Sequence, residues 1–178
     1  MKAILAALLL TLLLYTGCKN EEPEMANRAG LALSFDDYFV DNWSLYKNAF
    51  DSLNVKVTFY VCCYHDMNTA QRNLLKELRD AGHEIAYHST NHGNCSEMLK
   101  TMSIDKYLQN EIYPDLNKLR ADGFVIKNFA YPFGLSTYSS DSALRTLFRS
   151  MRKVARIDKN PYSLTTNQAF YEKLGPDK

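Results

Sequence analysis

Two of the four histidines lie in one short run of the sequence, His88-Ser89-Thr90-Asn91-His92. Two imidazoles four residues apart can bind one metal ion, most easily on a helical turn and also in a tight loop. The same spacing also arises by accident on surface helices, so the pair alone is weak evidence for a metal site. Other polar groups must converge on the pair before it indicates chemistry.

Adjacent carboxylates, Asp36 and Asp37, follow a short apolar run at residues 30–35. An isolated pair of aspartates usually caps a turn or is solvated. Here a second motif of the same kind, the turn sequence Tyr-Pro-Phe-Gly at residues 131–134, follows another apolar run. In parallel α/β folds the groups that perform chemistry gather at the carboxyl ends of the strands, so we expect the aspartates, the histidines and this turn to meet.

The elements that would position these motifs alternate between strand and helix, which predicts an α/β fold with a largely parallel sheet. Strands are predicted at residues 30–35, 56–62, 84–88, 125–131 and 153–157, and helices at residues 43–53, 69–81, 104–122 and 140–149. We expect Asn42 and Asn68 to cap the first two helices and Gly82 to end the second. Pro114 should kink or divide the third helix.

With these motifs in this order, residues 29–138 resemble the polysaccharide deacetylases of the NodB homology type, carbohydrate esterase family 4. The matching motifs are Ser34-Phe35-Asp36-Asp37, the run from His88 to His92, and the turn at residues 131–134. The family fold is a distorted (β/α) barrel of about seven units, of which this chain supplies four to five. The resemblance therefore implies an incomplete (β/α) barrel. A closed barrel usually needs more than ~200 residues, and with 178 residues the chain is expected to lack the C-terminal part of the domain.

The resemblance also implies a role for each motif. Asp37, His88 and His92 would bind a divalent metal ion, usually Zn²⁺ in this family, and Asp36 would be the general base. The backbone N–H of Phe133 would stabilise the oxyanion, and its neighbours Tyr131, Pro132 and Gly134 would contact the substrate. The activity implied is removal of N-acetyl or O-acetyl groups from a polysaccharide, which could be peptidoglycan, a chitin-like chain, an exopolysaccharide or acetylated xylan.

Three family features are absent from the sequence: the arginine of the third motif, the fourth motif with its aspartate and tryptophan, and the histidine of the fifth motif. Ala130 stands where the family has an arginine that organises the base, and no histidine follows His92 to act as the general acid. These departures leave a second hypothesis open: a catalytically impaired envelope lipoprotein that binds metal and carbohydrate. Of the other histidines, His83 is expected to be structural and His65 to be solvated. Tyr38, Phe39 and Trp43 are candidates for a sugar platform, although helix packing explains Trp43 better.

The amino terminus predicts export. Lys2 precedes 13 residues that are apolar except for Thr11, a run too short for the ~20 residues of a membrane-spanning helix, so residues 1–17 are predicted to be a signal peptide. Residues 14–18, Leu-Tyr-Thr-Gly-Cys, resemble a bacterial lipobox, which would place a lipid on Cys18. Residues 18–28 would then be a tether, with residues 29–178 forming the deacetylase domain at the cell envelope, anchored to the membrane.

Charge and cysteine content exclude other classes of protein. Removing Lys2 with the signal peptide cancels the formal net charge of +1, so no basic field remains to attract nucleic acid. Three cysteines remain beyond Cys18, and an odd number cannot all pair with one another, so no disulfide framework is implied. A pair involving Cys95 stays open. The sequence alone does not predict an oligomeric state.

Overall fold

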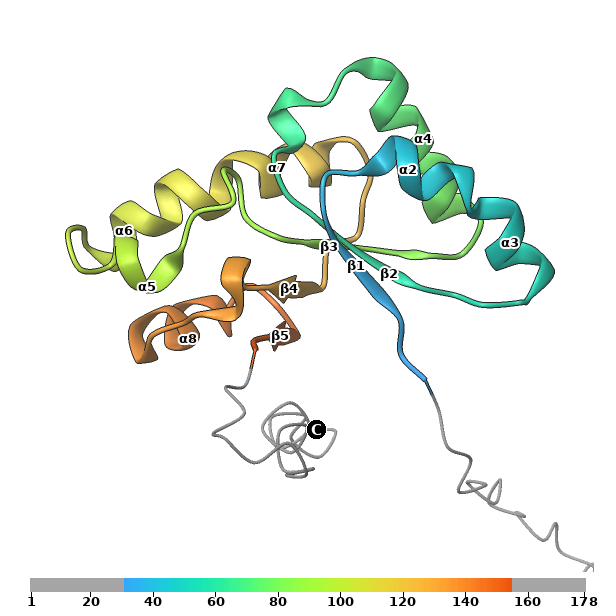
Figure 1. Ribbon diagram of the computed structural model, residues 1–178. Helices are drawn as coiled ribbons and strands as arrows, with labels where there is room; N and C mark the ends of the chain where they lie inside the picture. The colour runs from blue at the N-terminus through green and yellow to red at the C-terminus, as the bar shows by residue number, and fades with distance from the viewer. Residues whose placement is uncertain (1–30, 155–178) are drawn as a thin grey trace, which may run out of the picture. The chain divides into compact units, whose positions relative to one another are not determined.

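The computed structural model describes residues 31–154, and residues 32–154 belong to one compact unit. Its centre is a five-stranded sheet in which every neighbouring pair is parallel and the spatial order follows the chain, as in a half-barrel (Figure 1). The strands are β1 (Ser34–Asp37), β2 (Thr58–Val61), β3 (Glu84–Tyr87), β4 (Asn128–Ala130) and β5 (Ser150–Arg152). The incomplete (β/α) barrel expected from the sequence is thereby confirmed. The predicted signal peptide, the predicted tether and Cys18 lie outside the described residues.

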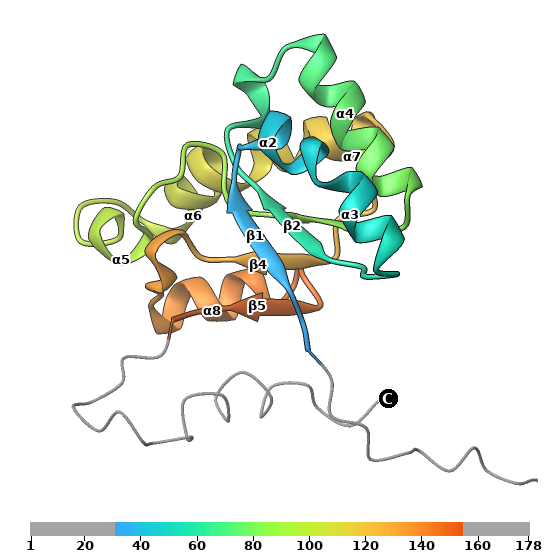
Figure 2. The ribbon, with the colours of Figure 1, turned by 45° about the vertical axis from the view of Figure 1, so that its right-hand side comes forward.

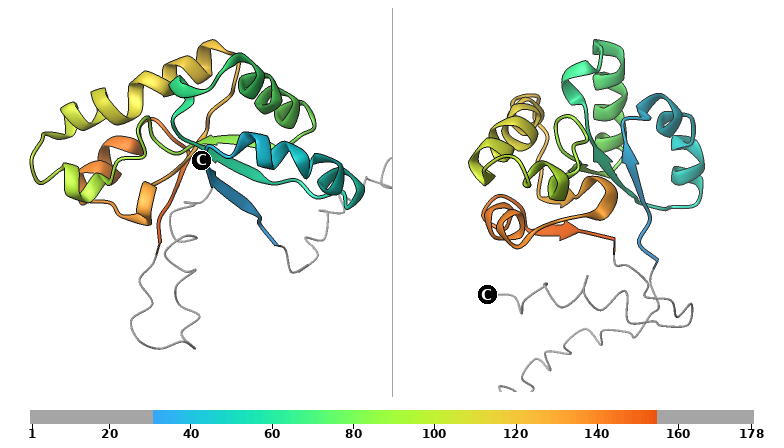
Figure 3. Two further views of the ribbon diagram at one scale, coloured as in Figure 1. Left: turned by 45° about the horizontal axis from the view of Figure 1, so that its top comes forward. Right: turned by 60° about the vertical axis from the view of Figure 1, so that its left-hand side comes forward.

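The helical segments connect consecutive strands. They are α2 (Val40–Leu45), α3 (Lys47–Ser52), η1 (Tyr64–Asp66), α4 (Thr69–Asp80), α5 (Cys95–Met98), α6 (Ile104–Tyr107), the π-helical η2 (Leu108–Ile112), α7 (Tyr113–Ala121), η3 (Pro132–Gly134) and α8 (Tyr138–Leu144). Crossovers between parallel neighbouring strands are right-handed, and strands in chain order then receive all their helices on the same face. Figures 2 and 3 show this layer of helices along one side of the sheet. Within the described residues no helix has the length and apolar character needed to cross a membrane.

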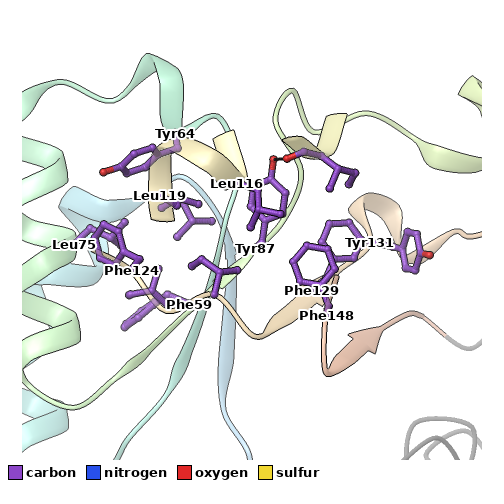
Figure 4. Close-up of a cluster of buried hydrophobic side chains, with 14 of the residues drawn as sticks. Phe59, Tyr64, Leu75, Tyr87, Leu116, Leu119, Phe124, Phe129, Tyr131 and Phe148 are labelled. Carbon is purple, nitrogen blue, oxygen red and sulfur yellow. Dashed lines mark hydrogen bonds between the residues drawn. The ribbon is translucent and has the colours of Figure 1, made fainter. Parts of the chain in front are cut away.

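Alternate residues of the strands separate two environments. Phe59, Tyr87 and Phe129 lie under the helices in the main apolar core, where Figure 4 shows their rings together with those of Tyr131 and Phe148. The intervening residues Tyr60, Ala86 and Ala130 form a small separate cluster. We call the side of the sheet that carries this small cluster, together with Asp36 and Arg152, the inner face. The period of two in a β-strand produces this division directly.

Local signals in the sequence placed the second helix well. Asn68 caps α4 with a reciprocal pair of hydrogen bonds to Gln71, and Gly82 follows with a φ of 89°. Leu75 and Leu78 are fully buried where α4 packs on the main apolar core, while Leu74 is only partly buried. The predicted boundaries and caps of this helix are confirmed.

Other boundaries were wrong. The helix predicted from residue 43 is two short helices that begin at Val40 and break at Tyr46, and Asn42 is not its cap. The first strand begins four residues later than predicted and includes both aspartates. A strand at Ser150–Arg152 precedes the predicted one at 153–157, because pairing with β4 decides its position, and residues 155–157 of that prediction lie outside the described residues. The fourth helix spans Tyr138–Leu144 instead of residues 140–149.

The three described cysteines are free thiols. Cys62 and Cys95 are buried, and burial raises the pKa of both thiols. The pair involving Cys95 that the sequence left open is not formed among the described residues. Cys62 and Cys95 are therefore small packing residues here.

Candidate active site

Three side chains predicted as metal ligands converge at the carboxyl end of the sheet. Nε2 of His92 lies 3.0 Å from Oδ1 of Asp37, and Nε2 of His88 lies 3.6 Å from the same oxygen. One potential ligand atom from each residue falls within 4.8 Å of the other two. Asp37 comes from the end of β1, and the histidines come from the loop after β3. Parallel pairing of β1, β2 and β3 brings the two ends together.

The backbone of Asp37 explains how adjacent aspartates can serve one site. In a regular strand the Asp36 and Asp37 side chains would point to opposite faces of the sheet. Asp37 has a φ of 85°, outside the extended region, so its side chain leaves the alternation of β1. Non-glycine residues adopt such values at a cost in free energy and are common at functional sites.

The orientation of His88 suits it to bind a cation. Nδ1 of His88 donates a hydrogen bond to the carbonyl oxygen of Ala130 at 2.8 Å, which leaves the Nε2 lone pair directed at Asp37. The imidazole is almost fully buried, and this burial lowers the pKa of His88 and favours its neutral form. A neutral histidine whose second nitrogen is held by a carbonyl is the usual arrangement in metal sites.

A broken helix holds the loop that carries the histidines. Pro114 has no N–H to donate to the carbonyl of Asn110, and the chain forms the π-turn η2 just before it. The Asn110 carbonyl accepts a hydrogen bond from the side chain of Asn91 at 3.2 Å, and the Glu111 carbonyl accepts one from the N–H of Thr90 at 2.7 Å. The helix break that the sequence predicted at Pro114 therefore leaves backbone carbonyl groups available to accept hydrogen bonds from the loop that carries the histidines.

Glu111 anchors the same loop through its carboxylate. The buried carboxylate accepts hydrogen bonds from the backbone N–H groups of Asn91 (3.0 Å) and Gly93 (3.2 Å) and from the Asn91 side chain (2.9 Å). A Cβ atom at Gly93 would lie 2.5 Å from Sδ of Met98 and 2.9 Å from Cδ of Glu111, so a larger residue there would force these side chains to shift. Ser89 and His92 have positive φ values of 75° and 56°, and these hydrogen bonds stabilise a strained loop.

Asp36, the predicted base, is not part of the three-residue ligand cluster. Both of its carboxylate oxygens contact Nη2 of Arg152, which comes from β5 at the opposite edge of the sheet. The electrostatic influence of Asp36 nevertheless reaches His88, where it favours the protonated form. The two aspartates therefore occupy one site with different partners: Asp37 faces the histidines and Asp36 faces an arginine.

The turn after β4 only partly matches its predicted role. Phe133 has a φ of 58°, and its exposed ring lies 4.9 Å from the ring of His92, beside the ligand cluster. Gly134 has no room for a side chain, because a Cβ atom would lie 2.3 Å from Val154. Tyr131, predicted to contact substrate, is instead buried in the core (Figure 4). Its hydroxyl donates a hydrogen bond to Asp141 at 3.0 Å. Pro132 is also buried.

The remaining histidines do not join this cluster. His83 packs edge-on against Phe50 and Phe59 in the main core, which agrees with the structural role predicted for it. His65, expected to be solvated, has Nδ1 2.7 Å from a carboxylate oxygen of the buried Asp115. The His65 side chain is still about 31% exposed, so it is partly solvated, as expected, and is also held by Asp115.

The aromatic residues after the aspartates separate into two kinds. Trp43 is buried and stacks on Phe59, so helix packing is its role. Tyr38 and Phe39 remain about half exposed, at 53% and 49%, and stack on each other with ring centroids 5.1 Å apart. They stay candidates for contact with a sugar.

Sequence reasoning missed two residues of the site, Glu111 and Arg152. Glu111 lies four residues after the buried Tyr107, so an acidic residue on the buried side of a predicted helix was the signal that could have revealed it. Arg152 was placed just before the predicted fifth strand. Its position opposite Ala130 depends on strand register, which the sequence pattern did not give.

The donor set fits a divalent cation. One carboxylate and two imidazoles, with the buried imidazole fixed by a carbonyl, are ligands that Zn²⁺ and related ions accept. Asp37, His88 and His92 would hold such an ion. The carboxylate of Asp36 would lie outside this set, paired with Arg152.

Solved structures of similar fold include carbohydrate esterases, deacetylases and a pseudoenzyme. A family 4 carbohydrate esterase from Streptomyces lividans matches with a TM-score of 0.56 and 20% identity, over 70% of this chain and 62% of its own. A peptidoglycan N-acetylglucosamine deacetylase matches with a TM-score of 0.53 and 27% identity, over 70% and 56%. A family 4 pseudoenzyme from Bacillus anthracis matches with a TM-score of 0.58 and 18% identity, over 71% and 43%. The chain thus spans less than two thirds of the length of these proteins.

No curated protein matches the chain in sequence. The family model for polysaccharide deacetylases matches residues 25–149, which cover β1 to the segment before β5 and include the aspartates, both histidines and the turn after β4. This match extends over well more than half of the sequence and agrees with the half-barrel and its motifs. The chain therefore belongs to the polysaccharide deacetylase family.

Proposed function

We propose that the protein is a metal-dependent hydrolase that removes acetyl groups from a polysaccharide at the cell envelope. N-acetyl groups are the preferred target and O-acetyl groups a further one. Zinc is the proposed metal, bound by Asp37, His88 and His92. The lipobox-like sequence supports export and attachment to the membrane through a lipid on Cys18. Fractionation of cells that produce the Cys18→Ser variant tests this location, because the variant should leave the membrane fraction.

The observation that carries the proposal is the separation of two carboxylates within one site. Asp37 belongs to the cluster with His88 and His92, whereas Asp36 lies outside it. A divalent cation in the cluster would supply positive charge that polarises the acetyl carbonyl. A carboxylate that is not a ligand can still accept a proton, which a hydrolase needs in order to activate water.

Each remaining residue then has a definite task. Asp36 accepts the proton from the attacking water, and the backbone N–H of Phe133 donates to the oxygen that becomes negative. The exposed rings of Phe133, Tyr38 and Phe39 offer apolar surface to the face of a sugar ring. The peptidoglycan deacetylase among the similar structures supports an N-acetylated sugar as the substrate class.

Acetate release from acetylated chito-oligosaccharides tests the proposed activity. The full chain should release acetate with Zn²⁺ present and stop when a chelator removes the metal. Asp36→Asn should lower turnover about 10²–10⁴-fold, the range for loss of a general base, while metal binding remains. Asp41→Asn is the matched control, since this aspartate lies on the exposed surface of α2. Turnover that survives Asp36→Asn contradicts the proposal.

The lack of a histidine placed to act as general acid favours a second candidate function, the binding of metal and glycan without catalysis. The general acid expected by resemblance has no histidine after His92 to supply it, His83 is packed in the core, and His65 is paired with Asp115. A form that binds metal and glycan without turnover fits this pattern. It predicts about one Zn²⁺ per chain and binding of acetylated oligosaccharide without acetate release. Sustained acetate release from the purified chain excludes it.

A further inference from the structure

Arg152 reaches across the inner face of the half-barrel from one edge strand to the other. In the sheet order β1 to β5 it stands on the last strand, and its partner Asp36 stands on the first. Neighbouring strands lie about 4.8 Å apart, so these residues meet only because the sheet curls. Arg152 thus bridges the open side of the half-barrel.

Small side chains leave the path of Arg152 clear. Ala130 is its partner in the register between β4 and β5, and Ala86 and Ala130 are the small members of the inner-face cluster. The third member, Tyr60, lies under the guanidinium at 4.9 Å from its ring centroid and is the register partner of Asp36. Tyr60 therefore supports the arginine at the point where it meets the carboxylate.

A single nitrogen of Arg152 contacts both carboxylate oxygens of Asp36. Nη2 of Arg152 lies 2.5 Å from both Oδ1 and Oδ2 of Asp36. About a third of the Asp36 side chain and a quarter of the Arg152 side chain remain exposed, so the pair is partly shielded from solvent. Without Arg152, Asp36 would be a free carboxylate next in sequence to the ligand Asp37.

We propose that Arg152 is a positioning residue that keeps the Asp36 carboxylate out of the metal ligand set. Asp37, His88 and His92 then bind the ion without Asp36, which stays available as a base. The assignment of Asp36 as the base rests on the proposed function, whereas its exclusion from the ligand set does not. Arg152 performs this task from β5, across the register from Ala130, where the resemblance to the family leads one to expect an arginine.

Measuring metal affinity tests directly whether Arg152 keeps Asp36 out of the metal ligand set. Competition between the full chain and a chromophoric chelator for Zn²⁺ gives the dissociation constant, and Co²⁺ absorption reports the number of ligands. Arg152→Ala should tighten metal binding about tenfold and change the Co²⁺ spectrum toward a higher coordination number, because Asp36 becomes a ligand. Removing the positive charge of Arg152 also strengthens metal binding by long-range electrostatics. To separate this effect from ligation by Asp36, Arg152→Ala is also made in the Asp36→Asn background. There the gain should be much smaller.

Moving the arginine supplies the sharpest control. Ala130→Arg combined with Arg152→Ala places the guanidinium on the neighbouring strand, at the register partner of its original position. This double variant should recover the metal affinity and the Co²⁺ spectrum of the unaltered chain. Arg149→Ala, at an exposed position close in sequence, should change neither. If Arg152→Ala fails to fold, judged by circular dichroism, Arg152→Lys and the double variant decide the matter, and both should retain the original affinity and spectrum.

Equal tightening by Arg152→Ala in the presence and absence of the Asp36 carboxylate would overturn the proposal, as would a folded double variant that keeps the tightened affinity. Where the chain releases acetate, Arg152→Ala should lower kcat about tenfold or more with little change in KM, and the double variant should restore kcat. If the chain binds metal but never releases acetate, the proposed function is refuted. The metal affinities of the Arg152 variants still test the role of Arg152 in that case.

Discussion

The two faces of the sheet are built from alternate residues of the same strands and differ in almost every property. The face under the helices carries large buried rings, such as Phe59, Tyr87 and Phe129. The inner face carries Tyr60 with the small Ala86 and Ala130, and the ion pair of Asp36 with Arg152. The first face contributes hydrophobic stabilisation, and the second leaves space and charge for chemistry.

The difference shows how a short polar motif is inserted into a fold without loss of the core. A strand can present a carboxylate to one face while its neighbours in sequence pack on the other, because the side chains alternate. Changes on the helical face should therefore affect stability first, and changes on the inner face should affect metal binding or turnover first.

The largest expected effect is on the helical face. Phe129 is fully buried and packs against Tyr87, Tyr131 and Phe148, so Phe129→Ala should cost about 3–5 kcal/mol of unfolding free energy. Urea denaturation measures this loss. Val125→Ala, at a site 74% exposed, is the control and should change stability by less than about 0.5 kcal/mol. A Phe129→Ala variant of unchanged stability would show that the ring is not part of a close-packed core.

An intermediate effect is expected where the helical layer supports the site. Glu111→Gln replaces a carboxylate that accepts three hydrogen bonds with an amide whose NH₂ group cannot accept. We expect about 1–3 kcal/mol lower stability and about 10–100-fold weaker Zn²⁺ binding, measured by denaturation and chelator competition. The matched control is Glu97→Gln, which breaks only an exposed ion pair with Lys100. Loss of stability without loss of metal affinity would mean that the loop does not need this anchor.

The smallest expected effect is a pH dependence of the core. Burial lowers the pKa of His83, and its Nδ1 accepts a hydrogen bond from the Val57 N–H at 3.3 Å. The unfolded chain therefore binds a proton at His83 more readily than the folded chain, and stability falls as pH drops below the unfolded value of about 6.5. Urea midpoints at pH 7 and pH 5 should differ less in His83→Asn, whose oxygen can replace the acceptor. If the urea midpoint changed equally between pH 7 and pH 5 in both proteins, His83 would not be the cause of the pH dependence.

The sequence predicted those parts of the fold that local signals define. Asn68 and Gly82 mark the ends of α4, and Pro114 marks the break between α6 and α7. The strand at Ser150–Arg152 was not predicted, because pairing with β4 and not the apolar pattern decides its position. The helix after β1 was predicted as one segment because its apolar spacing is continuous, although the chain breaks at Tyr46.

By itself, the sequence determined the types of group in the site and their order, because Asp36, Asp37, His88 and His92 follow predicted strands whose carboxyl ends meet in a parallel sheet. Only the tertiary structure decided how these groups divide their tasks. The left-handed backbone of Asp37, the carboxylate of Glu111 under the loop and the reach of Arg152 to Asp36 all depend on contacts between residues far apart in the chain. Such contacts follow from strand register and sheet curvature, which local sequence patterns do not encode.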